Sequence, residues 1–416
     1  MDIDKPLTLL GNLTPAQFMR RHWQKKPLVV RQAITPDQPR MSRANLFRLA
    51  ALPDVESRLI TQLPGLPKKT GRSSPSEAPV QWAMKSGPFA ARTLPALSIP
   101  GWTLLVQGVD LYDADVHALM QGFRFIPDAR LDDVMISFAT AQGGVGPHFD
   151  SYDVFLLQTS GRRRWRIGRQ KDLTLQEGVP LKILQNFEPD EEFVLEAGDM
   201  LYLPPRYAHD GVAQAFNDDG TPSQDCITCS IGFRAPAQAE LAAELLHRLA
   251  DFNLSDDSDD ETMAAQSPTR KIFYKDPGQI ATLTPAEMPA SLQTFAKNAV
   301  SQALKNPLAL ACVLGEYLTE PKPLVWFEEQ EQLPDGLFNT PIELDARTRM
   351  MYDTEHVFIN GESHRARGAD AKLMRRLADS RLLTPQELKR ASPAARELLQ
   401  SWTAAGWLRT STAIDL

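Results

Sequence analysis

Cysteine is scarce in this chain of 416 residues, which holds only three: Cys226, Cys229 and Cys312. A small, odd number argues against a disulfide framework and fits a reducing compartment. Cys226 and Cys229 have the spacing of half a zinc or redox motif. No second pair exists, however, and side chains three positions apart on a strand face opposite sides. We therefore expect these two cysteines to be small core residues.

Long apolar runs and a positive net charge are also missing. No stretch of about 18 apolar residues occurs, so the sequence predicts no membrane-spanning helix. The net charge is −7, which disfavours direct nucleic-acid binding, because such binding draws on counterion release by basic residues. An acidic chain favours a basic partner instead. Residues 1–6 lack the segments of a secretory signal, and with so few cysteines this predicts a cytoplasmic protein.

The pattern of apolar residues changes twice along the chain. A chain of this length is also longer than one hydrophobic core usually supports, so the sequence predicts two or three domains. From about residue 100 to 235, short apolar runs recur between turn signals, as in a β-sandwich or barrel. After Pro236, apolar residues follow a helical period at Leu241, Leu245, Leu249 and Phe252. We divide the chain into residues 1–236, 237–318 and 319–416, with an acidic loop at 255–261 in the middle part.

Several local signals predict where elements begin and turn. Thr14 with Gln17, and Thr384 with Glu387, form capping boxes that predict helix starts. Asn360 and Gly361 predict a tight hairpin after a short strand. Residues 69–79, rich in serine, proline and glycine, predict a loop.

A pattern typical of metal ligands lies at the end of the glycine-rich stretch 143–150, where His148 and Asp150 are two residues apart. On a strand, side chains i and i+2 point the same way, so both can face one ion. Further along, Pro204 and Pro205 end one strand and His209 opens the next. Two histidines and one carboxylate form a facial triad with open coordination positions, which is typical of non-haem iron(II) oxygenases. The other five histidines are expected to be surface or packing residues: His22, His117, His247, His356 and His364.

A run of arginines follows at residues 160–167. Arg163 shares one strand face with Trp165 and Ile167, so we expect it to point into the barrel; Arg162, Arg164 and Arg166 are expected to form a solvated patch. A buried cation needs an anion. A carboxylate of 2-oxoglutarate, bound by both prongs of the guanidinium, satisfies this need. The alternative is that all four arginines are solvated.

With these residues in view, the chain resembles the JmjC-type ribosomal oxygenases of the cupin superfamily. Within them it is most similar to the bacterial branch that hydroxylates an arginine of large-subunit ribosomal protein sixteen. The motifs that carry the resemblance cover most of residues 1–236, whereas the last third matches in layout only. They lie at residues 22–27, 123–127, 135–138, 143–155, 161–165, 204–205 and 232–236.

The resemblance implies an α+β fold: a double-stranded β-helix (jelly-roll, cupin or JmjC) catalytic domain, a helical dimerisation region and a winged-helix-like end domain. It also implies an iron(II)-, 2-oxoglutarate- and O2-dependent homodimer that hydroxylates the β-carbon of an arginine of a ribosomal protein, releasing succinate and CO2. Iron is expected at His148, Asp150 and His209, and 2-oxoglutarate at Arg163. Relatives carry a second polar group near Ala139, which Ser137 or Thr140 is expected to replace.

Three further residues near the metal ligands are predicted to contact the substrate: Tyr152, Asp153 and Gln158. An acidic group beside a guanidinium makes electrostatic sense. Each of the three can instead serve packing or support the metal ligands.

Three other functions stay open at this point. The chain can be an oxygenase of the same chemistry with another protein substrate, such as a histidyl hydroxylase or a lysine demethylase. It can be a non-catalytic nucleic-acid-binding protein whose end domain contacts phosphates through Lys372, Arg375, Arg376, Arg381, Lys389 and Arg390. It can also be a metal-storing or isomerase-type cupin, which would have no use for a buried Arg163.

Overall fold

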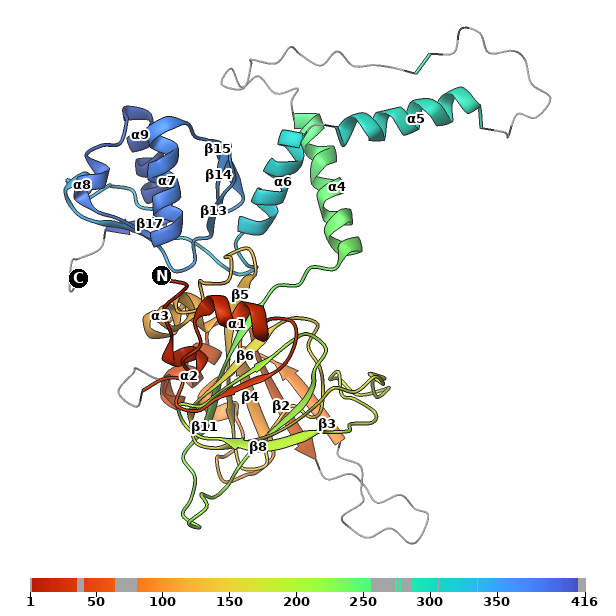
Figure 1. Cartoon of the computed structure of the whole chain (residues 1–416), viewed down its shortest axis with the longest axis vertical. Coiled ribbons are helices and arrows are strands. Elements are labelled where there is room, and N and C mark those ends of the chain that lie inside the picture. The colour runs from red at the N-terminus through yellow and green to blue at the C-terminus, as the bar shows by residue number, and fades with distance from the viewer. Residues whose placement is uncertain are drawn as a thin grey trace. The chain divides into compact units, whose positions relative to one another are not determined.

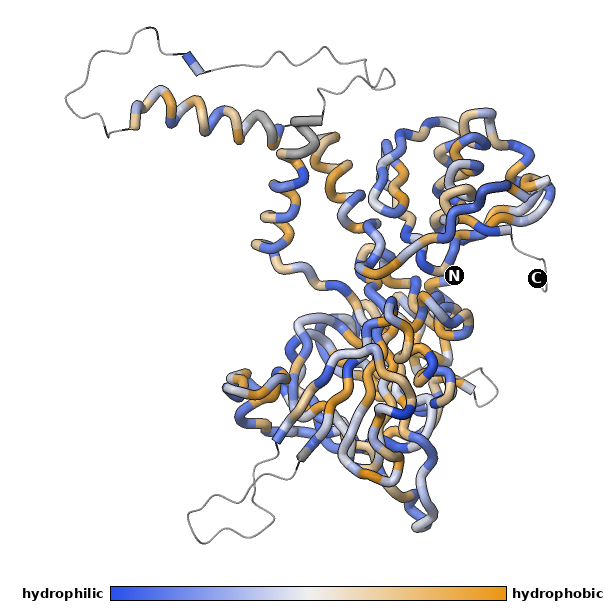
Figure 2. The backbone as a smooth tube through the Cα atoms, turned by 180° about the vertical axis from the view of Figure 1, so that it is seen from behind, coloured by the Kyte–Doolittle hydropathy of each residue, from blue (hydrophilic) through white to orange (hydrophobic). Residues whose placement is uncertain are grey.

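The computed structural model describes residues 2–35, 41–63, 81–255, 274–275, 277, 286, 288–305, 307–334 and 336–410. The chain divides into two compact units, Met1–Ala235 and Pro236–Leu416 (Figure 1; seen from behind in Figure 2). The loop expected at 69–79, and the acidic loop expected at 255–261 apart from its first residue, lie outside the described residues. Among the described helices, none has the length and apolar character needed to cross a membrane.

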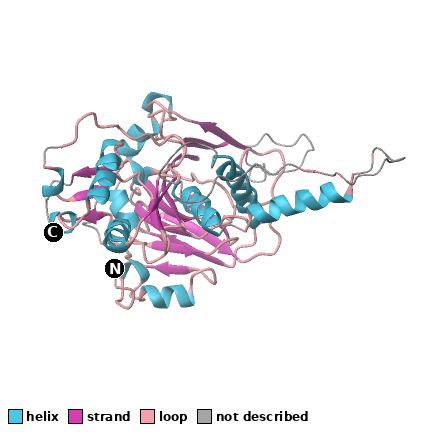
Figure 3. Ribbon diagram, turned by 90° about the horizontal axis from the view of Figure 1, so that it is seen from above, coloured by secondary structure: helices cyan, strands magenta, loops and turns pink. Residues whose placement is uncertain are grey.

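The first unit is built on two antiparallel sheets, whose strands are drawn side by side in Figure 3. The larger has eight strands in the order β1-β9-β6-β11-β5-β4-β2-β3, and the smaller has three in the order β10-β7-β8. The larger sheet comprises β1 (Leu28–Val30), β2 (Ser57–Leu63), β3 (Gln81–Ser86), β4 (Trp102–Val106), β5 (Leu131–Ala139), β6 (Val154–Ser160), β9 (Met200–Leu203) and β11 (Cys226–Phe233). The smaller comprises β7 (Arg163–Gly168), β8 (Glu191–Leu195) and β10 (Ala208–Ala213).

Helices cover the outer face of the large sheet. These are α1 (Pro15–Arg21), α2 (Arg43–Ala50) and α3 (Ala114–Gln121). Phe18 of α1 and Leu46 of α2 join Phe138 and Phe155 of the sheet in one apolar core. The start of α1 is as predicted, because the Thr14 side chain and Gln17 form a reciprocal capping box.

The inner face of the large sheet packs against the small sheet. Val154 and Leu156 of β6 share a core with Trp165 and Ile167 of β7, whereas Phe155 lies in the outer core. This period of two is what a strand buried on both faces requires. Two facing sheets with helices on one outer face confirm the predicted jelly-roll architecture.

The two neighbouring cysteines are free and buried, as expected. Cys229 points into the outer core, and Cys226 packs on the inner side with Ala139 and Ala213. Their opposite orientation excludes a shared metal ion.

The second unit opens with helices α4 (Gln238–Ser255), α5 (Ala290–Ala303) and α6 (Pro307–Thr319), of which α4 confirms the predicted apolar helix. Two small sheets follow, in the orders β16-β12-β17 and β13-β14-β15. Their strands are β12 (Ile342–Leu344), β13 (Met350–Tyr352), β14 (His356–Ile359), β15 (Glu362–Arg365), β16 (Leu382–Leu383) and β17 (Leu408–Thr410). The last helices are α7 (Gly368–Ser380), α8 (Pro385–Leu388) and α9 (Pro393–Ala404).

This end domain has a core of its own, which includes Ile342, Leu377 and Trp402. The predicted hairpin joins β14 and β15, where Asn360 and Gly361 both have positive φ, at 47° and 89°. The second predicted capping box begins α8, which runs for one turn only.

Candidate metal centre

The two sequence-adjacent metal candidates lie on a loop, and not on a regular strand as predicted. His148 forms an isolated backbone bridge with His209, with N to O distances of 2.9 and 2.8 Å, and the chain then loops to the start of β6. The backbone NH of Arg206 donates to the carbonyl of Asp150 at 2.6 Å. Backbone pairing between the two ligand segments, and not strand alternation, therefore sets the position of both side chains.

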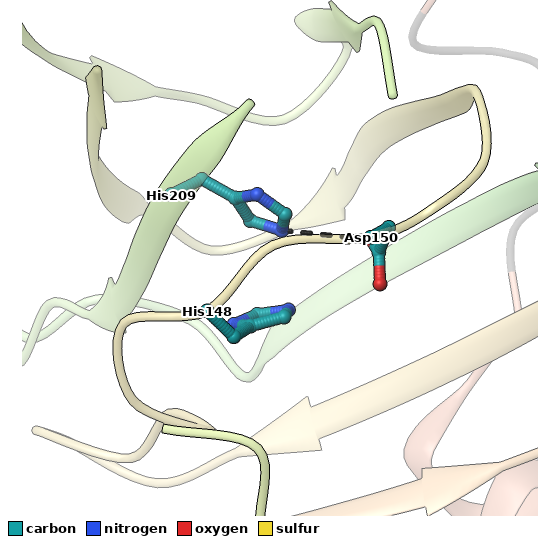
Figure 4. Close-up of side chains that lie close together, drawn as sticks. All are labelled: His148, Asp150 and His209. Atoms are coloured by element: carbon teal, nitrogen blue, oxygen red, sulfur yellow. Dashed lines mark ion pairs between the residues drawn. The ribbon is translucent and has the colours of Figure 1, made fainter. Parts of the chain in front are cut away.

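The third candidate arrives as the sequence predicts. β9 ends at Leu203, Pro204 and Pro205 follow, and His209 is the second residue of β10. Its ring reaches the other two side chains, as Figure 4 shows. The imidazole centroids of His148 and His209 are 4.2 Å apart, and Nε2 of His209 lies 3.7 Å from Oδ2 of Asp150.

One ligand atom from each of the three residues lies within 4.8 Å of the others. Nδ1 of His148 lies 2.8 Å from the carbonyl of Gly146, and Nδ1 of His209 lies 2.9 Å from that of Tyr207. Because a carbonyl only accepts, each Nδ1 carries its ring hydrogen. The lone pair of each Nε2 is therefore left for a metal ion. The donor set fits a divalent ion with open coordination positions.

The surroundings of His209 favour the neutral form of its imidazole, which is the form that binds a metal ion. Burial, together with the neighbouring His148, lowers the pKa of His209 to about 4, against 6.5 for an ordinary histidine. A metal binds the neutral imidazole, so this ring is ready to bind at neutral pH.

Arg163 points into the barrel between the two sheets, as predicted, and its side chain is 3% exposed. Its Nη1 makes one long hydrogen bond of 3.5 Å to the carbonyl of Gly211. Nε and Nη2 have no partner in the described part of the chain. A guanidinium that is desolvated and incompletely bonded is costly unless an anion reaches it.

The expected solvated patch on the other side of the arginine run is only partly present. Arg164 and Arg166 are partly exposed and pair with Glu192 and Asp210. Arg162 is buried, so this expectation was wrong for it; the residue lies in the turn before β7 and binds Glu196 at 3.2 Å and Asp218 at 2.8 Å. These two acidic partners lie far from Arg162 in the sequence, so strand alternation alone could not predict that Arg162 is buried.

The two candidates for the group missing at Ala139 differ in their bonding. The Thr140 hydroxyl is engaged by the backbone of Trp102, accepting from its NH at 3.3 Å and donating to its carbonyl at 3.4 Å. Ser137 lies on the inner face of β5, where its hydroxyl makes one long bond of 3.5 Å to the carbonyl of Thr228. Ser137 is therefore the better placed of the two to turn toward a ligand inside the barrel.

The three predicted substrate contacts lie in different environments. Tyr152 is 39% exposed, and burial of its hydroxyl beside the Asp150 carboxylate raises its pKa. Gln158 is fully buried in the barrel, where it accepts from Thr228 at 2.8 Å and donates to the carbonyl of Ser160 at 2.7 Å. Asp153 is also fully buried and bonded within the chain. Of the three, only Tyr152 is exposed beside the metal ligands, whereas Asp153 and Gln158 are enclosed and bonded within the chain.

Sequence reasoning missed two acidic residues near Tyr152. The carboxylates of Asp133 and Asp132 help to raise the Tyr152 pKa. A Cβ placed on Gly232 would lie 3.9 Å from both Oδ1 of Asp133 and Cε2 of Tyr152, so these groups flank the same small space. The sequence did contain a signal for Asp133: it lies four residues before Ser137, so strand alternation places both side chains on the same face of the strand.

The basic residues proposed as phosphate contacts are largely bonded within the end domain. Arg375 donates to the carbonyls of Asp353 and Thr354, Arg376 to Glu387, and Arg381 to the carbonyls of Thr348 and Asp345. Within the described part of the chain, only Lys372, Lys389 and Arg390 of that set make no such bond, which leaves a weak electrostatic footprint for nucleic acid.

Comparison with known proteins places these features in a family. Residues 118–241 match the family described as JmjC domain, and residues 302–409 match the family described as ROXA-like winged helix. The ribosomal protein uL16 3-hydroxylase of Escherichia coli is 32% identical over 306 residues, which are 73% of this chain and 70% of that protein. Human ribosomal oxygenase 1 is 27% identical over 222 residues, or 50% of this chain and 32% of that protein.

Solved structures extend the likeness over nearly the whole chain. The crystal structure of E. coli YcfD superposes with a TM-score of 0.75 and 27% identity, covering 96% of this chain and 98% of that chain. The structure of the ribosomal oxygenase YcfD in complex with cobalt and 2-oxoglutarate has a TM-score of 0.71, also at 27% identity, covering 95% of this chain and 98% of that chain. The chain therefore belongs to the JmjC-domain ribosomal oxygenases.

Proposed function

We propose that this protein uses iron(II), 2-oxoglutarate and O2 to hydroxylate the β-carbon of an arginine in a large-subunit ribosomal protein. The observation that carries the proposal is Arg163. A buried guanidinium, two of whose nitrogens have no partner among the described residues, shares the barrel with a facial set of metal ligands. A metal-storing or isomerase-type cupin has no use for that cation, whereas a dicarboxylate co-substrate needs it.

The chain's own residues supply binding and orientation. His148, Asp150 and His209 hold the ion, Arg163 binds the distal carboxylate of 2-oxoglutarate, and Ser137 adds a hydroxyl to it. Iron(II), when bound, supplies the oxygen activation that couples decarboxylation of 2-oxoglutarate to hydroxylation, giving succinate and CO2. Leu156, Trp165 and Leu203 belong to one buried apolar cluster, and Trp165 lies against the His209 ring, so water is excluded from this side of the metal ligands.

An arginine substrate is supported by the groups around Tyr152. Its ring offers a face for a planar cation, and Asp133 lies on the other side of the space above Gly232. A guanidinium can stack on the ring while it pairs with the carboxylate. A neutral histidine side chain would gain one hydrogen bond from the acidic group but no ion pair. The E. coli relative is named for 3-hydroxylation of ribosomal protein uL16.

The predicted homodimer is supported by the helices of the second unit. Large apolar side chains stay exposed on them, at Leu246, Leu292, Val300, Leu308 and Leu310, and Leu304 in the link between α5 and α6 is exposed as well. Leu292 and Val300 lie about two turns apart on α5, and with Ala296 and Ala299 between them they form an apolar stripe along one side of the helix. A second copy of the chain can cover such a stripe, as an interface core does. The cytoplasmic location stays a prediction from cysteine content.

Mass spectrometry of the recombinant ribosomal protein tests the function. The protein would be incubated with the enzyme, iron(II), ascorbate, 2-oxoglutarate and air, beside a His148→Ala control. We expect the mass of one oxygen to be added on an arginine, and no addition in the control. Succinate without oxidised arginine would keep the chemistry and discard the substrate. Neither product, from protein that holds iron, would contradict the proposal.

A further inference from the structure

The loop that carries Asp150 into β6 has a single buried side chain. His148, Phe149 and Asp150 are partly exposed, Ser151 and Tyr152 are exposed, and only Asp153 is enclosed. The start of the loop is held by the bridge to His209 and by the bond from Arg206. Asp153 is therefore the group available to fix its other end.

The Asp153 carboxylate joins three distant segments of the first unit. Its Oδ1 accepts from the Tyr202 hydroxyl at 2.6 Å. Its Oδ2 accepts from Nε2 of Gln24 at 3.0 Å and from Nη2 of Arg130 at 3.2 Å. These partners come from the turn after α1, the segment before β5 and strand β9. A carboxylate with several charge-assisted or short bonds is rigid, because each remaining rotamer would leave a buried donor unpaired.

The partners are themselves fixed, so the cluster forms a closed network. The Tyr202 hydroxyl accepts from the backbone NH of Gln24 at 2.7 Å while it donates to Asp153. The Arg130 guanidinium lies 5.4 Å from the ring of Trp23, which stacks on Tyr202 with centroids 6.0 Å apart. Burial and the bond to Asp153 raise the pKa of Tyr202, so its hydroxyl stays a donor over the physiological range.

We propose that Asp153 is a positioning residue: with Gln24, Arg130 and Tyr202 it fixes the loop that presents Asp150 to the metal and Tyr152 to the substrate. Through Asp153, the N-terminal segment after α1 thereby influences the position of a metal ligand that it does not contact. This inference rests on the proposed metal site. It replaces the direct substrate contact expected for Asp153, because the carboxylate is enclosed and fully engaged.

Asp199 offers a matched control for a substitution at Asp153. It is a second buried carboxylate of the same unit, paired with Arg31 at 2.6 Å and bonded to the backbone NH of Gln32 at 3.0 Å. It also ties an N-terminal segment to the barrel, but it lies in the turn before β9 and not on the loop that carries Asp150. Loss of either carboxylate affects stability, whereas only Asp153 acts on that loop.

The test compares Asp153→Asn and Asp199→Asn in the full chain, with cobalt(II) as the probe ion. Cobalt affinity is measured by calorimetry, and its absorption spectrum reports the ligand geometry. We expect Asp153→Asn to weaken cobalt binding roughly ten-fold and to shift the spectrum, as loss of a group that orients metal ligands does. Asp199→Asn is expected to leave both unchanged while lowering the melting temperature.

Equal cobalt affinity in Asp153→Asn and the wild type, or an equal loss in Asp199→Asn, would overturn the inference. Tyr202→Phe keeps the test decisive where Asp153→Asn fails to fold, because it removes one bond to the carboxylate; the same comparison of affinity and spectrum then applies. The proposed metal site itself would be contradicted if the wild type binds no cobalt, or if His148→Ala binds cobalt as tightly as the wild type. The His148→Ala control therefore separates failure of the metal site from failure of this inference.

Discussion

At the residue scale, the buried guanidinium of Arg163 makes the sharpest prediction. Replacing it in Arg163→Met removes a charge-assisted bond to the co-substrate, worth about 1.5–3 kcal/mol. We expect the affinity for 2-oxoglutarate to fall by roughly ten- to hundred-fold. Without co-substrate, the same variant should melt at a higher temperature than the wild type, because an incompletely bonded buried cation is gone.

Isothermal calorimetry with the cobalt-loaded protein measures that affinity. Arg164→Met is the control, since Arg164 lies on the same strand with its side chain on the other face. If the two variants bind 2-oxoglutarate equally well, Arg163 is not the anchor.

His209 gives a pH dependence to the metal-free protein. Burial beside His148 holds its pKa at about 4 in the folded chain, against 6.5 for an ordinary histidine. Between these values the unfolded chain binds a proton that the folded chain does not. Stability is therefore complete above about pH 6.5 and is lost as the pH falls toward 4, by about 3 kcal/mol at most.

Urea unfolding of the metal-free protein at a series of pH values checks this sign. His209→Gln should flatten the profile between pH 6.5 and 4, since the substituted group does not titrate. If the free energy of unfolding of that variant depends on pH as steeply as that of the wild type, a group other than His209 takes up the proton.

At the scale of elements, periodicity predicts well where packing is one-sided. The inward face of β7 and the apolar face of α4 follow from spacing alone, as do the hairpin at Asn360 and the capped start of α1. The environments of Asp153 and Gln158 did not follow, because their partners lie far away in the sequence, at Gln24, Arg130, Tyr202 and Thr228. A local pattern cannot reveal a distant donor.

The apolar stripe of α5 carries a prediction about assembly. Val300 is 58% exposed, and we expect it to be covered by a second copy of the chain. A glutamate there would leave a desolvated charge in the interface. Light scattering should find the wild type as a dimer and Val300→Glu as a monomer. Asn298→Glu adds the same charge on the polar side of α5 and should stay dimeric; a monomeric wild type would contradict the expectation.

At the scale of the whole molecule, two compact units with separate cores predict two unfolding steps. The metal ligands and Arg163 all lie in the first unit. Scanning calorimetry of the full chain should show two transitions, and cobalt with 2-oxoglutarate should raise only one of them. At a ligand concentration about 100 times the Kd, the gain is about 2.7 kcal/mol. A single transition that shifts as a whole would mean that the units unfold together.

The backbone bridge between His148 and His209 has a consequence for metal selection. Because main-chain hydrogen bonds fix the backbone of both residues, and each ring is held by its Nδ1 bond to a carbonyl, the protein does not need the ion to assemble its ligands. A preformed set of two nitrogens and one oxygen discriminates little by geometry and follows the general order of stability among divalent first-row metals. Cobalt, nickel or zinc should therefore displace iron readily in the purified protein, and which ion occupies the site in the cell is decided by supply.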